Sequence, residues 1–355
     1  MKDQYGRIID YMRISITDTC NLRCRYCMPE GVEIIPMSHL LTFEEIVKVC
    51  TAAAELGVRK LKVTGGEPLV RRGAPALFGM LREIPGIEDV TLTTNGVLLK
   101  KYLPALMDNG LRSVNISLDT MDLALYEKIT GQDAFLQVME SIETAVDAGL
   151  QVKINTVLLE GVNDNGWEQM LLYAGEHSVD VRFIEIMPIG AGSTFTGVSN
   201  QTLLARIQER YPDLTEDPSV HGNGPASYYS IPGFAGGVGF ISAMHGKFCD
   251  HCNRIRMSAQ GEIKPCLCYG TSVDLRQALR RSDPDGEENR TIRENKTIGN
   301  AGRLTGKSLS IENNSDRKNE LKSLLARAIW DKPQAHCFER RDAITEDKKM
   351  VSIGG

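Results

Sequence analysis

Six of the nine cysteines fall into two groups of three, and cysteine triads of this kind can bind a metal cluster. The first group is Cys20, Cys24 and Cys27 in "CNLRCRYC", and the second is Cys249, Cys252 and Cys266 in "FCDHCNRIRMSAQGEIKPC". A structural zinc site and an ordinary iron-sulfur cluster each take four protein ligands. Each triad therefore recruits a ligand from elsewhere or leaves one metal position open to another molecule.

Zinc is the main alternative to iron and sulfide at both triads. At the first triad zinc needs a fourth ligand, and the nearest histidine, His39, lies more than ten residues away, which favours an iron-sulfur cluster. At the second triad Cys268 or His251 can complete a zinc ribbon, so the pattern alone leaves zinc and iron-sulfur equally open. A redox dithiol fits three spaced cysteines poorly.

The remaining composition narrows the class of protein. An odd number of cysteines argues against a disulfide framework, and we expect Cys50, on a helical apolar face, and the isolated Cys337 to be structural. The 355 residues are 42% hydrophobic with a net charge of −5, and they contain no basic block and no 18-residue apolar run. The first residues, "MKDQYGRIID", show no apolar leader. We expect a cytoplasmic protein that binds neither nucleic acid nor membrane.

The elements that must position the triads alternate between β-patterned and helical segments up to residue 190. The β-patterned runs lie at 11–17, 60–64, 89–95, 113–119, 151–157 and 179–187. The first helical segment, "TFEEIVKVCTAAAELG", opens with a capping box of Thr42 and Glu45 and ends at Gly57. Repeated β–α units predict an α/β fold, an incomplete (βα)6 TIM-type barrel with its helices outside.

Five of the six strands have one apolar and one polar face. The apolar side chains can pack under the helices, so the polar ones, including Arg13, Lys62 and Lys153, should point inward. A filled barrel has an apolar interior, so this pattern predicts a cavity that holds a ligand. The sixth strand is ambiguous because Arg182 and Glu185 fall on opposite faces. An antiparallel sheet whose polar face meets water is the alternative.

Distinctive motifs follow five of these strands at the end where barrel active sites are built. The first cysteine triad follows the first strand and "GGEP" (65–68) follows the second. The others are "TTNG" (93–96) after the third, "SLD" (117–119) after the fourth and "MPIG" (187–190) after the sixth. This distribution predicts one central site.

The first triad resembles the radical S-adenosylmethionine (SAM) superfamily. The resemblance rests on the spacing Cys-x3-Cys-x2-Cys, on Tyr26 before the last cysteine and on "GGEP", which matches the glycine-rich SAM-binding element. It implies a 4Fe-4S cluster whose open iron binds SAM, and a 5′-deoxyadenosyl radical as the reactive product.

Most of the chain is similar to the GTP 3′,8-cyclase family of molybdenum cofactor biosynthesis. That similarity adds Cys249-x2-Cys252-x13-Cys266, "CNRIR" and the terminal Gly354-Gly355, and it runs from about Tyr5 to Gly270 and resumes near residue 320. It implies a second 4Fe-4S cluster with three cysteine ligands, Cys266 being the third and Cys268 a bystander. It divides the chain into a partial barrel at 1–230 and an auxiliary-cluster region at 231–355.

The resemblance also assigns binding residues. Those implied for SAM are Tyr26, Gly66, Ser117 and Met187. Those implied for GTP are Arg13, Lys62, Thr93, Lys153, Arg254, Ile255 and Arg256. The cations among them agree with the charge argument, since a triphosphate carries about four negative charges that an acidic protein must neutralise locally.

The reaction implied by the family starts with abstraction of the ribose C3′ hydrogen of GTP and attack on guanine C8, which needs no side-chain acid or base. The implied partners are an electron donor such as flavodoxin or ferredoxin, a second copy in a homodimer, and the cyclic pyranopterin monophosphate synthase that takes the product. The family's terminal glycines, here Gly354 and Gly355, imply a tail that enters the active site.

One segment departs from the family pattern. Residues 281–320 are polar, and we expect a flexible insert before a final helix that starts near residue 320. "GNAGRLTGKS" within it lacks the spacing of a phosphate-binding loop, because Ala301 stands where the first glycine is needed.

Two other functions stay open at this point. A radical SAM peptide-modifying enzyme also carries auxiliary clusters, although usually with more cysteines in its C-terminal part. A binding module stabilised by zinc at both triads is the alternative from another class.

Overall fold

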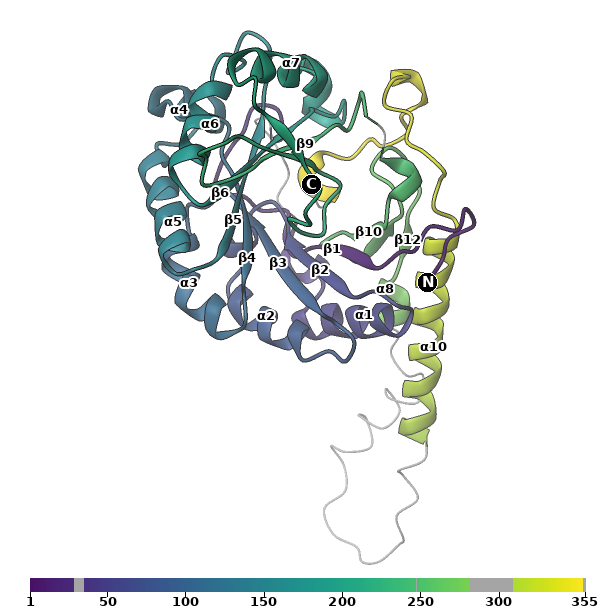
Figure 1. Ribbon diagram of the computed structural model, residues 1–355. Helices are drawn as coiled ribbons and strands as arrows, with labels where there is room; N and C mark the ends of the chain where they lie inside the picture. The colour runs from purple at the N-terminus through teal and green to yellow at the C-terminus, as the bar shows by residue number, and fades with distance from the viewer. Residues whose placement is uncertain (29–34, 247, 281–308, 354–355) are drawn as a thin grey trace, which may run out of the picture.

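A computed structural model describes residues 1–28, 35–246, 248–280 and 309–353 of the chain. Within these residues a single sheet has the strand order β12-β11-β10-β1-β2-β3-β4-β5-β6-β9-β8-β7. Figure 1 looks into this curved sheet, with most of the helices around its outside. The expected α/β class and the incomplete barrel are confirmed.

The six predicted strands form the centre of the sheet. They are β1 (Tyr11–Ser15), β2 (Lys60–Thr64), β3 (Asp89–Thr94), β4 (Ser113–Ser117), β5 (Gln151–Val157) and β6 (Val179–Ile184). Each pairs in parallel with the next, which excludes the antiparallel alternative. Four of them end before the predicted residue, because the last residues leave the ladder and enter the loops that carry the motifs.

Helices cover the outer face of this sheet. They are α1 (Phe43–Glu55), α2 (Ala74–Arg82), α3 (Leu99–Asp108), α4 (Leu123–Thr130), α5 (Phe135–Asp147), α6 (Trp167–Glu176), α7 (Asn200–Arg210), α8 (Arg276–Arg280) and α10 (Leu309–Trp330). The capping box predicted at the start of α1 is present, since Glu45 N donates to Thr42 Oγ1 and Thr42 N donates to Glu45. No helix in the described ranges is long and apolar enough to cross a bilayer.

Short 3-10 helices lie in the loops. They are η1 (Met37–His39), η2 (Pro68–Val70), η3 (Gly190–Thr194), η4 (Cys249–His251), η5 (Arg341–Ala343) and η6 (Met350–Ile353).

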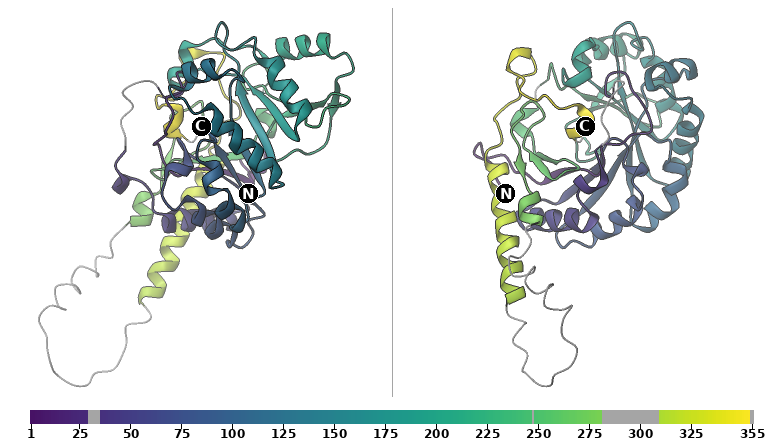
Figure 2. Two further views of the ribbon diagram at one scale, coloured as in Figure 1. Left: turned by 90° about the vertical axis from the view of Figure 1, so that its left-hand side faces the viewer. Right: turned by 180° about the vertical axis from the view of Figure 1, so that it is seen from behind.

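The C-terminal half of the chain extends the sheet at both edges. Its strands are β7 (Thr215–Asp217), β8 (Ser227–Ser230), β9 (Val238–Ile241), β10 (Arg254–Met257), β11 (Glu262–Lys264) and β12 (Val273–Asp274). Strand β9 pairs in parallel with β6, and β10 pairs in parallel with β1. The C-terminal strands thus narrow the opening of the partial barrel, as both views of Figure 2 show. The domain division at residue 230 stays a prediction, with one sheet running through both parts.

The two faces of the strands are used as their alternation predicts. The outward side chains Ile14, Leu61, Leu92 and Val114 are fully buried in the main hydrophobic core under the helices. The inward side chains are polar, and Arg13 of β1 stands in register between Lys62 of β2 and Arg256 of β10. The barrel interior is therefore polar and positively charged.

Helix α10 corrects the expectation of a flexible insert that lasts to residue 320. The helix begins at Leu309, and Figure 1 shows it running along the side of the barrel next to the N-terminus. Lys318 and Lys322 form ion pairs of 2.5 and 3.1 Å with Glu55 of α1. Residues 315–320, "SDRKNE", are all polar, and this composition indicated a loop. In the structure Lys318 pairs with Glu55 at the surface instead of packing into an apolar core. Residues 281–308 of the predicted insert lie outside the described residues.

Candidate active site

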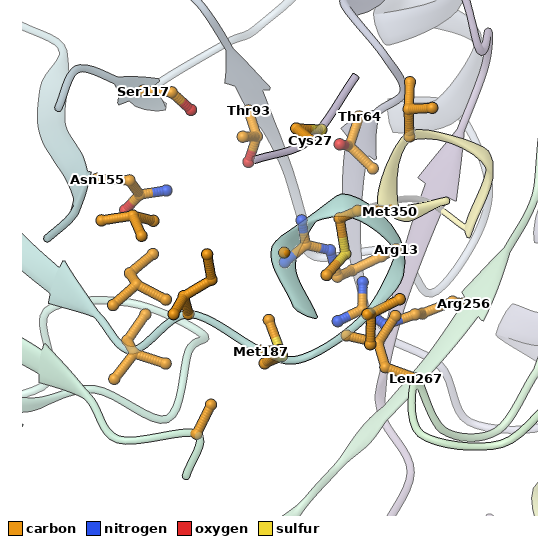
Figure 3. A pocket seen from close by; sticks show the side chains of 18 of the residues that line it. Arg13, Cys27, Thr64, Thr93, Ser117, Asn155, Met187, Arg256, Leu267 and Met350 are labelled. Atoms are coloured by element: carbon orange, nitrogen blue, oxygen red, sulfur yellow. The ribbon is translucent and has the colours of Figure 1, made fainter. Parts of the chain in front are cut away.

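A cavity of about 340 Å³, within the size range of small-molecule sites, runs along the polar inner face of the sheet. Both cysteine triads line it, together with residues from the ends of β1 to β6 and from the C-terminal segment. Figure 3 shows Arg13 and Arg256 on one side of this cavity and Thr93, Ser117 and Asn155 on another. The single central site predicted by the motifs is thus present.

The first triad lies in a tight turn after β1. Cys27 N and Met28 N both donate to Cys24 O, at 3.0 and 2.8 Å, which keeps this part of the loop compact. Leu22 N approaches Cys20 Sγ at 3.4 Å. Burial, and then the neighbouring Cys20 and Asp119, raise the pKa of the Cys27 thiol to about 12. Thiols this close disfavour one another's ionisation, so a cationic group that binds them as thiolates would relieve the repulsion.

The donor sets fit iron-sulfur clusters better than single zinc ions. No three His, Cys, Asp or Glu side chains in the described ranges converge closely enough to share one metal ion. A 4Fe-4S cluster binds each thiolate through a different iron, so its ligands need only surround a common space. All three cysteines of each triad line the cavity, a placement compatible with three thiolates that bind three different irons.

The candidates for a fourth zinc ligand at the second triad point elsewhere. Cys268 is fully buried in a separate small core, where its Sγ lies 2.9 Å from Cys337 Sγ. His251 is exposed to solvent. Neither residue lines the cavity, whereas Cys266 does. This placement favours Cys266 over Cys268 and His251 as the partner of Cys249 and Cys252, and the ligand set itself stays a prediction.

The "GGEP" loop packs directly on the first triad's loop. A Cβ atom on Gly66 would lie 2.5 Å from Thr19 O and 2.7 Å from Asp18 O, so only glycine fits there. The sequence argument expected a close approach to SAM at this position. The close approach in the structure is to the backbone of the cysteine loop, and Gly66 also lines the cavity.

Two carboxylates that the sequence argument missed hold these loops. Glu67 is fully buried and accepts hydrogen bonds from Leu69 N, Thr94 Oγ1 and Asn95 N, at 2.9, 2.8 and 2.6 Å. Burial raises the pKa of Glu67 to about 7. The only sequence signal for this role was the acidic residue within "GGEP". Because Glu67 is buried in the structure, its carboxylate needs hydrogen-bond partners.

The second of these carboxylates is Asp119. It accepts a hydrogen bond of 2.7 Å from Tyr26 Oη and one of 2.9 Å from Val157 N. Burial raises the pKa of Asp119 to about 6. Its position in "SLD", after β4, was noted in the sequence without a role.

All four residues implied for SAM line the cavity, namely Tyr26, Gly66, Ser117 and Met187. Ser117 ends β4 and the other three lie in the loops after β1, β2 and β6, which the parallel strands bring to the same end of the sheet. Whether each contacts SAM stays a prediction.

The residues implied for GTP divide into two groups. Arg13, Thr93, Arg254 and Arg256 line the cavity. Lys62 and Lys153 lie deeper and are 8% and 2% exposed. Ile255 is fully buried in the core on the opposite face of β10, so its side chain does not reach the cavity. Period-two alternation turns this side chain away from those of Arg254 and Arg256, so the assignment of Ile255 to GTP stays a prediction that its backbone groups would have to satisfy.

Arg182 joins the inward cations and resolves the ambiguity of the sixth strand. Its Nε and Nη2 donate to Asn155 Oδ1 at 2.9 and 2.6 Å. Burial, followed by positive charges that include Arg182 and Arg13, lowers the pKa of Lys62 well below its ordinary value. Burial and Arg182 lower the pKa of Lys153 to about 8. This excess of buried positive charge suits a strongly anionic ligand.

The C-terminal segment reaches the same cavity. Met350 and Val351 of η6 line it, and Figure 3 shows Met350 among the side chains of the lining. Two ion pairs with β11 anchor this segment, one between Glu346 and Lys264 and one between Lys348 and Glu262. Gly354 and Gly355 lie outside the described residues.

Comparison with known families defines the class of protein. A model of the radical SAM superfamily matches residues 14–174, and a model described as Molybdenum Cofactor Synthesis C matches residues 179–299. The parallel sheet, the cysteine triad and the first of these matches identify a radical SAM enzyme.

Similarity to curated proteins extends over the whole chain. The GTP 3′,8-cyclases of Clostridium perfringens (strain 13) and Petrotoga mobilis are 39% and 41% identical, over 100% of this chain and of each relative. That of Pelotomaculum thermopropionicum is 44% identical over 79% of this chain and 88% of its own. This chain belongs to the GTP 3′,8-cyclase family.

Solved structures agree with the fold. A crystal structure of Streptococcus suis SuiB bound to S-adenosylmethionine has a TM-score of 0.56 at 15% identity, covering 80% of this chain and 68% of SuiB. SuiB bound to its precursor peptide SuiA has a TM-score of 0.54 at 14% identity, covering 98% and 76%. At this low identity the likeness supports the radical SAM fold and gives no information about the substrate.

Proposed function

We propose that the cavity is the active site in which this radical SAM GTP 3′,8-cyclase converts GTP to (8S)-3′,8-cyclo-7,8-dihydroguanosine 5′-triphosphate. This is the first step of molybdenum cofactor biosynthesis. The observation that carries the proposal is the convergence of two cysteine triads and several buried cations on one cavity. Such a convergence suits a reaction that needs a radical source and a triphosphate substrate in the same place.

Two 4Fe-4S clusters would be held by three cysteines each. Cys20, Cys24 and Cys27 would hold the first, and Cys249, Cys252 and Cys266 would hold the second. With SAM bound, the first cluster supplies one-electron reductive chemistry that generates an organic radical. Tyr26, Gly66, Ser117 and Met187 are the proposed SAM contacts.

The chain's own residues bind and orient GTP. Arg13, Arg254 and Arg256 present guanidinium groups that suit forked contacts to phosphate oxygens. Lys62 and Lys153 add positive charge from deeper in the barrel, and Thr93 offers a hydroxyl group on the opposite side. Ile255 can contribute only backbone groups. These contacts would fix the ribose and guanine relative to the radical source, which is the main requirement of the reaction.

The apolar part of the lining would keep water away from the radicals. Leu22, Met28, Ile189, Leu267 and Phe338 line the cavity between the polar groups. We propose, on the family resemblance alone, that the terminal Gly354 and Gly355 act in this active site.

Several partners follow from the chemistry. The reductive step consumes an electron that no side chain supplies, so an electron donor such as flavodoxin or ferredoxin is required. We propose that the product passes to cyclic pyranopterin monophosphate synthase and that the enzyme is a homodimer. A cytoplasmic location is proposed because nine cysteines without a disulfide suit a reducing compartment.

Metal analysis together with turnover tests the proposed function. Protein prepared and reconstituted without oxygen should contain iron and inorganic sulfide, and it should form 5′-deoxyadenosine from SAM with dithionite only when GTP is present. ATP serves as the control nucleotide. Zinc without sulfide would favour the binding module, and 5′-deoxyadenosine formed equally with ATP would refute GTP as the substrate.

A further inference from the structure

Two buried cations tie the second cysteine triad to the segment that follows helix α10. Arg7 comes from the N-terminal segment before β1, and Lys332 comes directly after α10. Arg7 is 8% exposed and Lys332 is 3% exposed, so both residues lie in the interior. Neither residue was singled out in the sequence, because each sits far from the cysteines along the chain.

Lys332 bridges the backbone on both sides of the triad. Its Nζ donates to Arg254 O at 2.9 Å and to Pro265 O at 2.6 Å. Arg254 follows the ligand Cys252 by two residues, and Pro265 directly precedes the ligand Cys266. One ammonium group therefore sets the spacing between two of the three ligands.

Arg7 holds the backbone of the remaining ligand, Cys249, in a similar way. Its Nη1 donates to Cys249 O at 2.8 Å and to Gln334 O at 2.7 Å, and its Nη2 donates to Pro333 O at 2.7 Å. The backbone N of His336 approaches Cys249 Sγ at 3.5 Å. The segment 332–336 thus touches all three ligand-bearing stretches, either directly or through these two cations.

Arg7 and Lys332 differ in whether a carboxylate neutralises their positive charge. Arg7 forms a buried ion pair of 2.6 Å with Asp3, so the pair is neutral as a unit. In the part of the chain that the structure describes, no carboxylate lies within ion-pair distance of Lys332. Lys332 also lines the cavity together with Cys249, Cys252 and Cys266.

We propose that Lys332 is a positioning residue of the second cluster, holding the stretches of Cys252 and Cys266 together and compensating the negative charge of the cluster and its thiolates. Arg7, paired with Asp3, positions Cys249 without adding net charge. This inference rests on the proposed occupancy of the second triad by a 4Fe-4S cluster. A cluster with three thiolates gains one further negative charge on reduction, so a nearby cation that lacks a carboxylate partner favours the reduced form.

The test uses the full chain with Cys20, Cys24 and Cys27 replaced by alanine, so that any cluster belongs to the second triad. In this background we compare Lys332→Gln, which removes the charge but keeps a donor, with Lys332→Arg, which keeps both. Iron and sulfide content and the midpoint potential of the cluster are measured without oxygen. Lys101→Gln on the exposed surface of α3 is the matched control.

Lys332→Gln is expected to shift the midpoint potential to more negative values, while Lys332→Arg and Lys101→Gln stay near the parent. The double variant Asp3→Asn/Arg7→Gln is expected to lower the cluster content and leave the potential of the loaded fraction unchanged. A fully loaded Lys332→Gln variant with the parental potential would overturn the inference. If Lys332→Gln loses its cluster, an iron and sulfide content of Lys332→Arg equal to that of the parent supports the inference. Loss of the cluster in both variants overturns the claim that the charge of Lys332 is what matters.

Failure of the proposed function gives a different result. If the parent with the first triad removed binds no iron and sulfide at all, the second cluster itself is refuted, whatever Lys332 does.

Discussion

The hydroxyl group of Tyr26 donates a hydrogen bond of 2.7 Å to Asp119 Oδ2, which joins the loop of the first cysteine triad to the end of strand β4. Asp119 also accepts a hydrogen bond from Val157 N at the end of β5, so one carboxylate connects the cysteine loop, the segment after β4 and the end of β5. The aromatic residue inside the Cys-x2-Cys spacing thus anchors the metal-binding loop to the barrel.

Removal of this hydrogen bond should loosen the first triad. Tyr26→Phe leaves the ring in place but deprives a buried carboxylate of a donor, at a cost of about 1–3 kcal/mol in the free energy of unfolding. We expect lower iron content at the first triad with the fold retained. Urea denaturation and iron analysis check this, with Tyr102→Phe on α3 as the control. Unchanged stability and iron content in Tyr26→Phe would show that the bond has no anchoring role.

The choice of Cys266 over Cys268 as the third ligand can be tested by paired alanine variants. Cys266 lines the cavity, whereas Cys268 points into a separate core against Cys337. Cys266→Ala should lose the second cluster and Cys268→Ala should keep it, as measured by iron and sulfide per chain. The reverse pattern would show that the ligand is Cys268.

The buried positive charge of Lys153 should lower the free energy of unfolding of the ligand-free protein and should strengthen the binding of GTP. It is buried near Arg182, and burial is the main cause of its lowered pKa. Lys153→Met should therefore unfold at higher urea concentration than the wild type at neutral pH, yet bind GTP about 10- to 100-fold more weakly. Isothermal titration without SAM measures the affinity. Lys101→Met, on the exposed face of α3, should change neither quantity.

The stability difference between wild type and Lys153→Met should depend on pH. Because the folded-state pKa of Lys153 is lowered from about 10.5 to about 8, the unfolded chain binds more protons between these values. The wild type therefore gains stability relative to the variant as the pH rises from about 8 to about 10.5. Urea denaturation across this range measures the difference, and a constant difference would contradict the assigned burial of the charge.

The anchoring of the C-terminal segment can be tested at its buried ion pair. Glu346→Gln leaves Lys264 buried without its partner and should lower the free energy of unfolding by about 3 kcal/mol. The double variant Lys264→Met/Glu346→Leu removes both charges and should recover most of that loss, as measured by urea denaturation. Equal losses in the single and double variants would mean that the pair contributes packing and no electrostatic stabilisation.

The barrel was predictable because each strand has its own alternation of polar and apolar side chains. Ile14 and Arg13, adjacent in sequence, point to opposite faces as period two requires, and the same rule excludes the side chain of Ile255 from the cavity. The two cysteine triads were visible as spacings, but their relative placement was not. The first triad follows the carboxyl end of β1, whereas Cys252 precedes β10, which runs parallel to β1, so the second triad lies toward the amino end of β1.

The residues that support the triads were not predictable from local patterns. Lys332 and Arg7 lie far from the cysteines in the sequence and act through backbone carbonyls, which no motif records. Helix α10 was predicted too short because residues 315–320 of the sequence are all polar, and the contact of Lys318 with Glu55 is an ion pair. Such features depend on tertiary contacts that a single sequence does not reveal.

Transfer of a labelled hydrogen from substrate to cofactor tests the central claim most directly. Reconstituted protein is incubated without oxygen with SAM, dithionite and GTP that carries deuterium at C3′, and the 5′-deoxyadenosine is analysed by mass spectrometry. We predict that deuterium appears in 5′-deoxyadenosine from this substrate and is absent when the deuterium is at C2′. Unlabelled 5′-deoxyadenosine from the C3′-labelled substrate would contradict the account of this cavity as the site of a GTP 3′,8-cyclase.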